Sequence, residues 1–305
     1  MATFRDKLQQ AGEDSDVPTA RSLTFLSDLS SENRAALREM WPYFHANRRR
    51  HIISKLVIMA EDNIELDFRH VFMFGLEDWD EQVRFSAIEG LYEDESKLLL
   101  GKLLTIVRND PDERVREAAA KALGRFTYLA QCDKLGPPSD RLRSVLIESA
   151  RDTQEKPDVR RRAVEALGYL DGDSDVQDLI RDTYERGGVQ AESAVFAMGR
   201  SMDALWTNVV LGELSSEQAA MRYEAARAAG EMVLEDAIPR LALLVDDTDS
   251  EVRLAAVWAL GQIGGRVAAQ ALAIVLKSDD PAMREAAREA LQELAFAADP
   301  LNVIR

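Results

Sequence analysis

A ten-residue phrase, Val-Arg-x-x-Ala-x-x-Ala-Leu-Gly, recurs along most of the chain and constrains the fold more than any other feature. Clear copies read VRFSAIEGLY from residue 83, VREAAAKALG from residue 115, VRRRAVEALG from residue 159 and VRLAAVWALG from residue 252. Looser copies read QAESAVFAMG from residue 190, MRYEAARAAG from residue 221 and MREAAREALQ from residue 283. The arginine position falls at residues 84, 116, 160, 191, 222, 253 and 284, so the last four intervals are 31 residues each. This regular spacing indicates a repeat protein.

Each copy has the pattern of a short amphipathic helix. In residues 110–126, Asp110 can cap the helix, Pro111 suits its first turn, and Glu113 can complete a capping box. Apolar residues follow at offsets 0, 3, 4, 7, 8 and 11 from Val115, which is one stripe on a helix with 3.6 residues per turn. The stripe is mostly alanine, so it permits close helix contact but buries little area. Such a helix needs neighbours to be stable.

A second amphipathic helix is predicted between successive copies, as in residues 100–107, where leucine and valine recur on one face. Two short helices and two turns in 31 residues form an αα-hairpin. Stacked hairpins bury in their neighbours what none can bury alone. An earlier, degenerate copy begins at Arg49, which makes eight units. We therefore predict an all-α fold, an α-solenoid in which about eight αα-hairpins form a superhelical stack.

The repeats also set the expected domain organisation. Residues 1–22 are polar and are predicted to form a mobile N-terminal tail, followed by a single solenoid over residues 23–305. Apolar residues between Leu23 and Trp41 are expected to form a capping hairpin that shields the first repeat. Residues 127–140 interrupt the repeat spacing and contain a Gly-Pro-Pro run, so we expect a protruding loop insertion there.

The acidic turn, the Val-Arg pair and the following Ala-x-x-Ala-Leu-Gly resemble the HEAT-repeat family, in its short phycobilisome-lyase-like (PBS lyase) variant. The resemblance covers roughly residues 45–295 and implies HEAT-like repeats. It also implies that the arginine after valine lies along the core and bonds carboxylates or carbonyls of adjacent turns. The structural repeat arginines are then Arg84, Arg116, Arg160, Arg222, Arg253 and Arg284. Ala191 departs from this pattern, and we expect a softer or bent stack there.

Charge limits the kinds of partner. The net charge is −16 at pH 7 and the pI is about 4.8, so the field of the protein repels phosphate backbones and anionic lipids. We therefore expect neither nucleic acid nor a membrane as a partner. The sequence shows no signal-like segment and no apolar run of membrane-spanning length, and it contains one cysteine, Cys132. These features are typical of a cytoplasmic protein.

Catalytic residues, cofactors and bound metals are not expected. His45, His51 and His70 precede alanine, isoleucine and valine, so none begins the His-Glu pair with which HEAT-like di-iron hydroxylases hold metal. The sequence also lacks the P-loop, H-E-x-x-H and G-x-S-x-G motifs. We therefore predict that the protein is not an enzyme.

Two acidic turns and two arginine runs admit more than one interpretation. Aspartates stand at positions 1, 3, 5 and 12 of residues 171–182, as in a calcium-binding loop, but Val176 replaces the glycine of position 6. We favour helix capping for this turn and for residues 246–251. The arginine runs 48–50 and 160–162 each contain one repeat arginine, and we expect their other arginines on a solvated face. Docking of an acidic partner on these runs is the alternative.

The main candidate binding site lies on the helix face opposite the buried stripe. Offsets 2 and 6 from the valine position fall on this face and are charged in several repeats, as at Glu117 and Lys121. Three consecutive repeats depart from this rule with Phe196, Tyr223, Arg227, Leu254 and Trp258. A HEAT-like stack would present this row on its inner, concave surface, and aromatic residues with arginine are typical of interface hot spots. The alternative is that these side chains pack against a neighbouring repeat.

The predicted function is that of a non-enzymatic interaction scaffold or adaptor, which binds a partner peptide or protein in its concave groove. Apolar side chains would anchor the partner, and Arg227 would pair with a carboxylate or stack on a ring. The acidic surroundings favour a basic segment in the partner. The resemblance leaves a second hypothesis, a subunit or chaperone-like cofactor of a bilin (phycobilin) lyase, in which the patch holds the rings and propionates of the bilin. A HEAT-like DNA-repair glycosylase is disfavoured by the negative charge.

Overall fold

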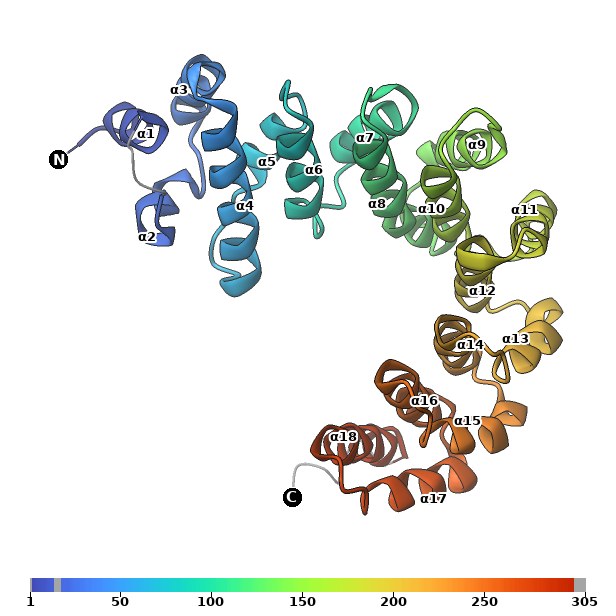
Figure 1. Ribbon diagram of the computed structural model, residues 1–305. Coiled ribbons are helices and arrows are strands. Elements are labelled where there is room, and N and C mark those ends of the chain that lie inside the picture. Colours follow the sequence, from blue (N-terminus) through green and yellow to red (C-terminus); the bar gives the residue numbers. More distant parts are fainter. Residues whose placement is uncertain (1, 14–17, 299–305) are drawn as a thin grey trace. The chain divides into compact units, whose positions relative to one another are not determined.

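The computed structural model describes residues 2–13 and 18–298, and the regular elements of these residues are helices (Figure 1). The first α-helices are α1 (Phe4–Glu13), α2 (Ala20–Leu23), α3 (Ser31–Met40), α4 (Ala46–Asp62), α5 (Arg69–Gly75), α6 (Glu81–Gly90), α7 (Lys97–Asn109), α8 (Glu113–Gln131) and α9 (Pro138–Arg151). They are followed by α10 (Pro157–Leu167), α11 (Ser174–Glu185), α12 (Gly188–Ser201), α13 (Thr207–Glu213), α14 (Ala219–Glu231), α15 (Ile238–Leu244), α16 (Ser250–Ile263), α17 (Gly265–Val275) and α18 (Pro281–Ala298). The predicted all-α fold is confirmed.

The chain divides into two compact units. Unit 1 comprises residues 1–126 and 153–159, and unit 2 comprises residues 127–152 and 160–305. Each unit has its own apolar core, which includes the fully buried Phe72 in unit 1 and Leu260 in unit 2.

Within each unit, the helices alternate between two rows. In unit 2, α12, α14, α16 and α18 pack in succession and form the row that we call inner, while α11, α13, α15 and α17 form the outer row (Figure 1). In unit 1, α4, α6 and α8 form the inner row, and α3, α5 and α7 form the outer row. In the described residues, eight successive outer–inner pairs run from α3 to α18. The prediction of an α-solenoid of about eight αα-hairpins is confirmed.

The small residues of the repeat let neighbouring inner helices approach closely. A Cβ atom added at Gly199 of α12 would lie 2.7 Å from the Cα of Ala228 on α14. One added at Gly230 of α14 would lie 2.6 Å from an edge carbon of the Trp258 ring on α16. Ordinary carbon–carbon contacts are about 3.5–4.0 Å, so neither position has room for a side chain. The glycine of the repeat therefore sets the spacing of the inner row.

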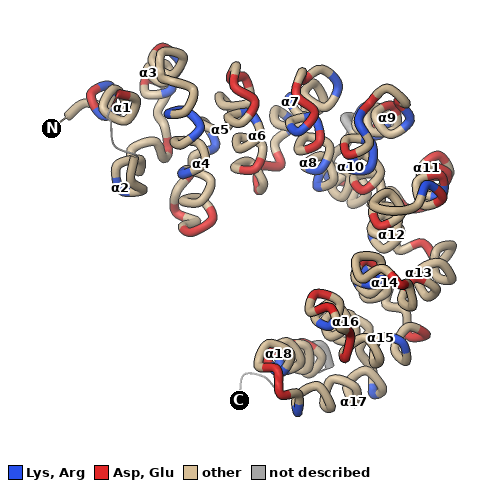
Figure 2. Tube along the Cα trace, in the orientation of Figure 1, with Lys and Arg blue, Asp and Glu red and all other residues tan. Residues whose placement is uncertain are grey.

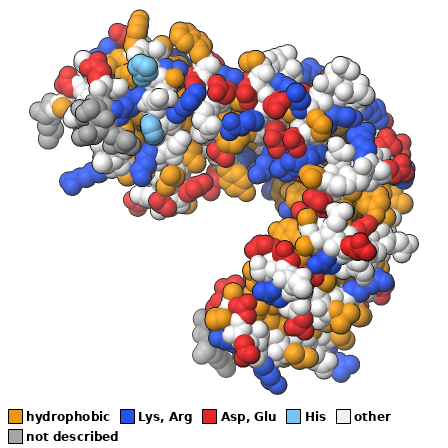
Figure 3. All heavy atoms as spheres, in the orientation of Figure 1, with side chains coloured by type: hydrophobic (Ala, Val, Ile, Leu, Met, Phe, Trp, Pro, Cys, Tyr) orange, Lys and Arg blue, Asp and Glu red, His pale blue; other side chains and the backbone are white. Residues whose placement is uncertain are grey.

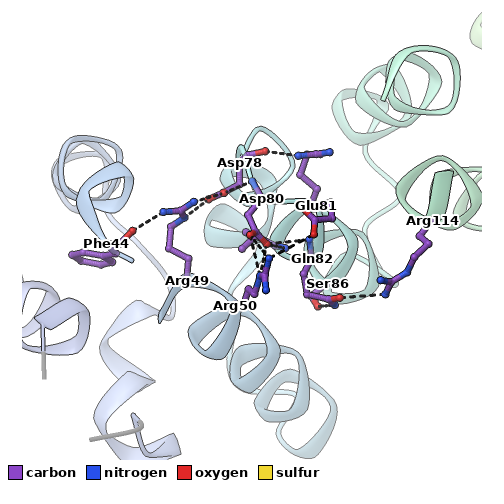
Figure 4. A network of polar contacts seen from close by, with 11 residues as sticks. Phe44, Arg49, Arg50, Asp78, Asp80, Glu81, Gln82, Ser86 and Arg114 are labelled. Carbon is purple, nitrogen blue, oxygen red and sulfur yellow. Dashed lines mark hydrogen bonds and ion pairs between the residues drawn. The ribbon is translucent and has the colours of Figure 1, made fainter. Parts of the chain in front are cut away.

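The repeat arginines of unit 1 form a ladder of ion pairs between turns. The Nε and Nη2 atoms of Arg84 each donate to the carboxylate of Asp110 at 2.8 Å, while Nη1 donates to the carbonyl of Asp78. Arg116 makes the same bidentate contact with Glu155. In the degenerate first copy, Arg49 binds Asp78 and the carbonyl of Phe44, and its neighbour Arg50 binds Asp80 (Figure 4). These pairs join each turn to the next repeat.

The ladder is less regular in unit 2. Arg222 keeps the bidentate pair, with Asp247. Arg160 and Arg284 donate to the backbone carbonyls of Ala150 and Ser278, respectively. Arg253 donates to the carbonyls of residues 247 and 248 and lies 3.6 Å from the carboxylate of residue 280. Position 191 holds a buried alanine, so α12 contributes no arginine to the ladder.

The N-terminal segment differs from the predicted tail. Residues 4–13 form α1, in which Leu8 is fully buried and Ala11 is nearly so. The two apolar side chains are one helical turn apart, and a polar helix can pack on so narrow a stripe. Residues 14–17, also part of the predicted tail, lie outside the described residues. Leu23 and Trp41 of the expected capping hairpin are both buried, and the cap itself stays a prediction.

The insertion at residues 127–140 is more ordered than the expected protruding loop. Helix α8 continues through residue 131, and α9 begins at residue 138. Leu129 and Leu135 are buried, and the hydroxyl of Thr127 donates to the carbonyl of Ala166. Most of the insertion therefore lengthens two helices, because its leucines can reach the core.

The arginine runs also differ from the prediction of solvated side chains. Arg161 and Arg162 pair with Glu165 one turn along α10, and their side chains are 16% and 26% exposed. Arg50 is partly buried against Asp80. The carboxylates placed one turn or one repeat away hold these guanidinium groups against the helices.

Candidate interaction site

The five predicted patch residues lie on three successive inner helices of unit 2. Phe196 belongs to α12, Tyr223 and Arg227 to α14, and Leu254 and Trp258 to α16. All five side chains are partly exposed. Helix α14 packs against both α12 and α16, so the five residues belong to one row of adjacent helices.

Two arginines stack on the aromatic rings of this row. The guanidinium carbon of Arg227 lies 3.6 Å from the centroid of the Trp258 ring. The guanidinium carbon of Arg200 lies 4.9 Å from the Phe196 ring and 5.5 Å from the Tyr169 ring. Cation–π contacts of this kind hold both partners in one orientation. Arg227 is therefore held against a ring of its own chain, and its predicted contact with a partner stays a prediction.

A cavity of about 190 Å³ opens between α12 and α14. Its lining includes Phe196, Arg200, Tyr223, Glu224, Arg227 and Glu231. Three of the five predicted residues thus meet around one cavity, and Trp258 adjoins it through its contact with Arg227. Leu254 belongs to the same row but not to the lining. Carboxylates and aromatic rings line the same cavity. Figure 2 marks acidic and basic positions along α14.

The carboxylates of this cavity are held in an unfavourable environment. Burial raises the pKa of Glu224 to about 7, and the negative charges of Glu165, Glu192 and Glu231 act in the same direction, while Arg227 opposes them. Burial also raises the pKa of Glu231, against the opposing charges of Arg200 and Arg227. Burial is therefore the main cause of both shifts, and the nearby carboxylates add to it at Glu224.

The other carboxylates near Glu224, Glu231 and Glu165, have partners. Glu231 lies 3.3 Å from the Nη2 atom of Arg200 and 3.8 Å from that of Arg227. Glu165 accepts hydrogen bonds from the hydroxyl of Ser193 and from Arg162. Neither a hydrogen bond nor an ion pair of the Glu224 carboxylate occurs among the described residues.

The sequence analysis did not single out Arg200, Glu224 and Glu231. It compared offsets 2 and 6, whereas Glu224 is at offset 3 and the other two are at offset 10 of their repeats. Offset 10 lies at about 280° around a helix, beside the compared face, whereas offset 3 lies at about 300°, at the edge of the apolar stripe. A scan of the whole polar arc would have found Arg200 and Glu231, and the signal for Glu224 was a carboxylate at a stripe position.

The acidic turns act as helix caps. Asp173 accepts hydrogen bonds from the backbone N–H groups of residues 175 and 176 at the start of α11, and it pairs with Arg143. Asp249 caps α16 in the same way. In the described part of the chain, no group of three or more potential metal ligands is close enough to hold an ion. None of the described helices combines the length and the apolar character needed to cross a bilayer.

A family model for HEAT repeats matches residues 72–137 and 207–292. Both stretches consist of HEAT repeats. The second stretch contains Tyr223, Arg227, Leu254 and Trp258, and Phe196 lies just before it. The PBS lyase variant remains a prediction. No curated protein sequence matches the chain.

The chain is similar to several solved structures. A chain of the Kap95p–RanGDP structure is 14% identical, with a TM-score of 0.50 over 98% of this chain and 46% of that one. An engineered protein is 18% identical, with a TM-score of 0.43 over 96% of this chain and 88% of that one. Human deoxyhypusine hydroxylase in complex with glycerol is 20% identical, with a TM-score of 0.32 over 96% of this chain and 97% of that one. At such identities the likeness to the Kap95p–RanGDP structure concerns the fold alone. The fold is a HEAT-repeat α-solenoid.

Proposed function

We propose that this protein is a non-enzymatic interaction scaffold whose inner face in unit 2 binds a segment of a partner protein. Phe196, Tyr223, Leu254 and Trp258 form the apolar part of this binding site, and Arg227 orients the Trp258 ring. HEAT-repeat solenoids similar to the importins serve as scaffolds for protein interactions, which supports the assignment of this class. In the Kap95p–RanGDP structure, the solenoid-like relative is bound to a protein.

The observation that carries the proposal is the meeting of aromatic rings and one carboxylate without an ion pair among the described residues, Glu224, around one cavity. A lysine or arginine side chain of the partner would place its charge at Glu224 and its aliphatic stem against Phe196 and Tyr223. The raised pKa of Glu224, about 7, supports this orientation because an incoming cation would stabilise the charged form. We therefore propose a partner with a basic segment.

The inner row is suited to binding because it requires little rearrangement. Glycine and alanine contacts hold α12, α14 and α16 in close contact, and two arginines fix the orientations of the exposed rings. A preformed site avoids the entropy cost of ordering its side chains when the partner binds.

The bilin hypothesis is the second candidate. Arg200 and Arg227 beside aromatic rings could bind the propionates and rings of a bilin, but Glu224 and Glu231 face the same cavity and would repel the propionates. We therefore favour the protein scaffold. A titration of the protein with a bilin tests the alternative, since binding would shift the visible absorption band.

A random peptide library displayed on phage tests the scaffold proposal with a defined probe. At pH 8 we expect the full-length protein to enrich peptides that combine lysine or arginine with an apolar residue. Binding should weaken at pH 6, where Glu224 is protonated. Phe196→Gln and Glu224→Gln should each remove the enrichment without lowering the melting temperature by more than a few degrees.

Two matched variants serve as controls. Tyr43→Gln removes an aromatic ring that is 87% exposed in unit 1, and Glu289→Gln removes an exposed carboxylate at offset 6 of the last repeat. Both should leave the enrichment unchanged. Enrichment of acidic peptides, or enrichment that survives Glu224→Gln and Phe196→Gln alike, would contradict the proposed site.

A further inference from the structure

A second cavity lies in unit 1, between the outer helices α3, α5 and α7. Its volume is about 310 Å³. The cationic side chains at its edge are Arg34 and Arg38 from α3, Arg69 from α5 and Lys102 from α7, and the carboxylates are Glu77 and Asp94. The cations outnumber the carboxylates in a protein whose net charge is −16. This local reversal of charge is the first indication of an anion-binding surface.

Three of the four cations have little or no compensating charge. For the guanidinium groups of Arg34 and Arg38, neither a hydrogen bond nor an ion pair occurs among the described residues. Arg69 lies 3.9 Å from Asp67 and 4.0 Å from Asp94, at the limit of an ion pair. Only Lys102 has a close partner, Glu77. The guanidinium groups are therefore available to an external anion.

The titration of His70 is consistent with this excess of positive charge. Burial lowers the pKa of its imidazole, and the charges of Arg34 and Arg69 lower it further, while Asp67 and Asp28 oppose them. His70 lines the same cavity as these two arginines. An anion bound here would raise the pKa of His70, which makes this residue a reporter of occupancy.

The floor of the cavity is apolar. Met73 and Phe74 are partly exposed, and the side chain of Leu98 is 65% exposed although it lines a cavity. A small inorganic anion would leave this surface in contact with water. A ligand that joins an anionic group to an apolar side chain would cover it.

Asp94 adds a requirement for a hydrogen-bond donor. Its side chain is 6% exposed, and one oxygen accepts a hydrogen bond from the backbone N–H of Ser96. The other oxygen, Oδ2, has no hydrogen-bond partner among the described atoms, since its 4.0 Å separation from Arg69 is too long for one. A buried acceptor without a donor is costly, and a peptide N–H group of a ligand would satisfy it.

We propose that this basic cavity of unit 1 binds an acidic segment of a partner protein, with glutamate or aspartate carboxylates at Arg34, Arg38 and Arg69. An apolar side chain of the segment covers Leu98 and Phe74, and a backbone N–H group donates to Asp94. Charge complementarity identifies the occupant as acidic, whereas the inner face of unit 2 is proposed to bind a basic segment. The two proposals involve different helices and are independent.

The probe is a fluorescein-labelled Glu-Glu-Leu-Glu-Glu peptide, with Gln-Gln-Leu-Gln-Gln as the uncharged comparison. Fluorescence anisotropy at low ionic strength should show that the full-length protein binds the acidic peptide and that added salt weakens binding. The double variant Arg34→Gln/Arg38→Gln should lose about tenfold in affinity, since two charge contacts are removed. The matched double variant Arg141→Gln/Arg266→Gln makes the same charge change at exposed positions of unit 2 and should stay within about twofold.

The imidazole NMR signals provide the second readout. The chain has three histidines, and the signal of His70 is assigned by its loss in His70→Gln. Saturating peptide should raise the pKa of His70 and leave the chemical shifts of the other two imidazole signals unchanged. Three results would overturn the proposal: equal weakening by both double variants, no change at His70, or an equal response to inorganic phosphate with no tighter binding of the peptide.

Discussion

The cavities of unit 1 and unit 2 are built from the same kind of hairpin but carry opposite chemistry. In unit 1 the cavity lies among outer helices, and uncompensated arginines surround it. In unit 2 it lies between inner helices, and carboxylates with raised pKa values face aromatic rings. In the space-filling view, the visible histidines lie in unit 1 with cationic and apolar side chains around them (Figure 3). The comparison teaches that the repeat fixes the packing faces and leaves the remaining faces free to differ.

The ion pair made by the repeat arginine also differs between the units in distance and burial. In unit 1 the Arg84–Asp110 pair is bidentate, and the two side chains are only 10% and 6% exposed. In unit 2 the Arg253–Asp280 pair is 3.6 Å long, with side chains 26% and 40% exposed. A buried pair loses more when one partner is removed, because the remaining charge has no access to water.

The largest expected effect follows from this difference. Arg84→Ala should lower the free energy of unfolding by about 3 kcal/mol, because it leaves the Asp110 carboxylate buried and unpaired. Arg253→Ala should lower it by less than about 1 kcal/mol. Urea denaturation of both variants measures the contrast. Equal losses of unfolding free energy in the two variants would mean that the repeat arginines stabilise both units to the same extent.

The next prediction concerns the acidic cavity of unit 2. The folded-state pKa of Glu224 is about 7, above its ordinary value of 4.5, so folding favours the protonated form. The contribution of this residue to stability therefore falls as the pH rises from about 4.5 to about 7. At pH 8, Glu224→Gln should raise the free energy of unfolding by about 2 kcal/mol, and at pH 4 it should have little effect.

The control for this pH dependence is Glu289→Gln, because Glu289 is an exposed carboxylate of the last inner helix. Its effect on the free energy of unfolding should be small at both pH values. Denaturation curves between pH 4 and pH 8 provide the measurement. A Glu224→Gln variant whose stability runs parallel to that of the wild type across this range would show that the carboxylate is solvated.

A smaller effect distinguishes the inner row of unit 2 from its outer row. Gly230→Ala places a methyl group against the Trp258 ring and should lower the free energy of unfolding by about 1–2 kcal/mol. Gly212→Ala, on outer helix α13, meets no atom within 4 Å and should raise stability by about 0.5–1 kcal/mol. In thermal unfolding, Gly230→Ala should lower the melting temperature and Gly212→Ala should raise it. A stabilising Gly230→Ala would show that the inner helices can move apart.

The smallest effect concerns the stacking of Arg227 on Trp258. Arg227→Ala should lower the free energy of unfolding by only about 0.5–1 kcal/mol. It should also increase quenching of tryptophan fluorescence by acrylamide, because the ring face becomes accessible. Trp258→Phe identifies the part of the signal that comes from this residue. If quenching is unchanged, Arg227 does not cover the ring in solution.

The order of the repeat hairpins was predictable from the sequence, whereas the N-terminal helix and the extension of α8 were not. Valine, alanine and glycine at fixed offsets specify a helix that must pack on its neighbours, so the number and order of the hairpins followed from the repeat. The helix at residues 4–13 was missed because Leu8 and Ala11 are too few to give a periodic signal. The extension of α8 was missed because a departure from repeat spacing resembles a loop.

The candidate sites were predictable only in part. Phe196, Tyr223 and Trp258 stood out because apolar residues replaced polar ones at matched offsets. Arg200 did not stand out, because charged residues are common on the polar arc of any helix. Glu224 did not stand out, because only the face opposite the stripe was compared. The basic cavity of unit 1 combines residues from three outer helices, such as Arg34 and Arg69, that no single repeat contains.

The sequence by itself determined the repeat length, the buried stripe and the closeness of the inner helices. These are local properties, because side chains at fixed offsets dictate which face of each helix must be covered. Only the tertiary structure decided which charges remain without a partner. Whether Glu224 or Arg34 is neutralised depends on groups from other helices and on its distance from water, and these quantities arise when the hairpins pack together.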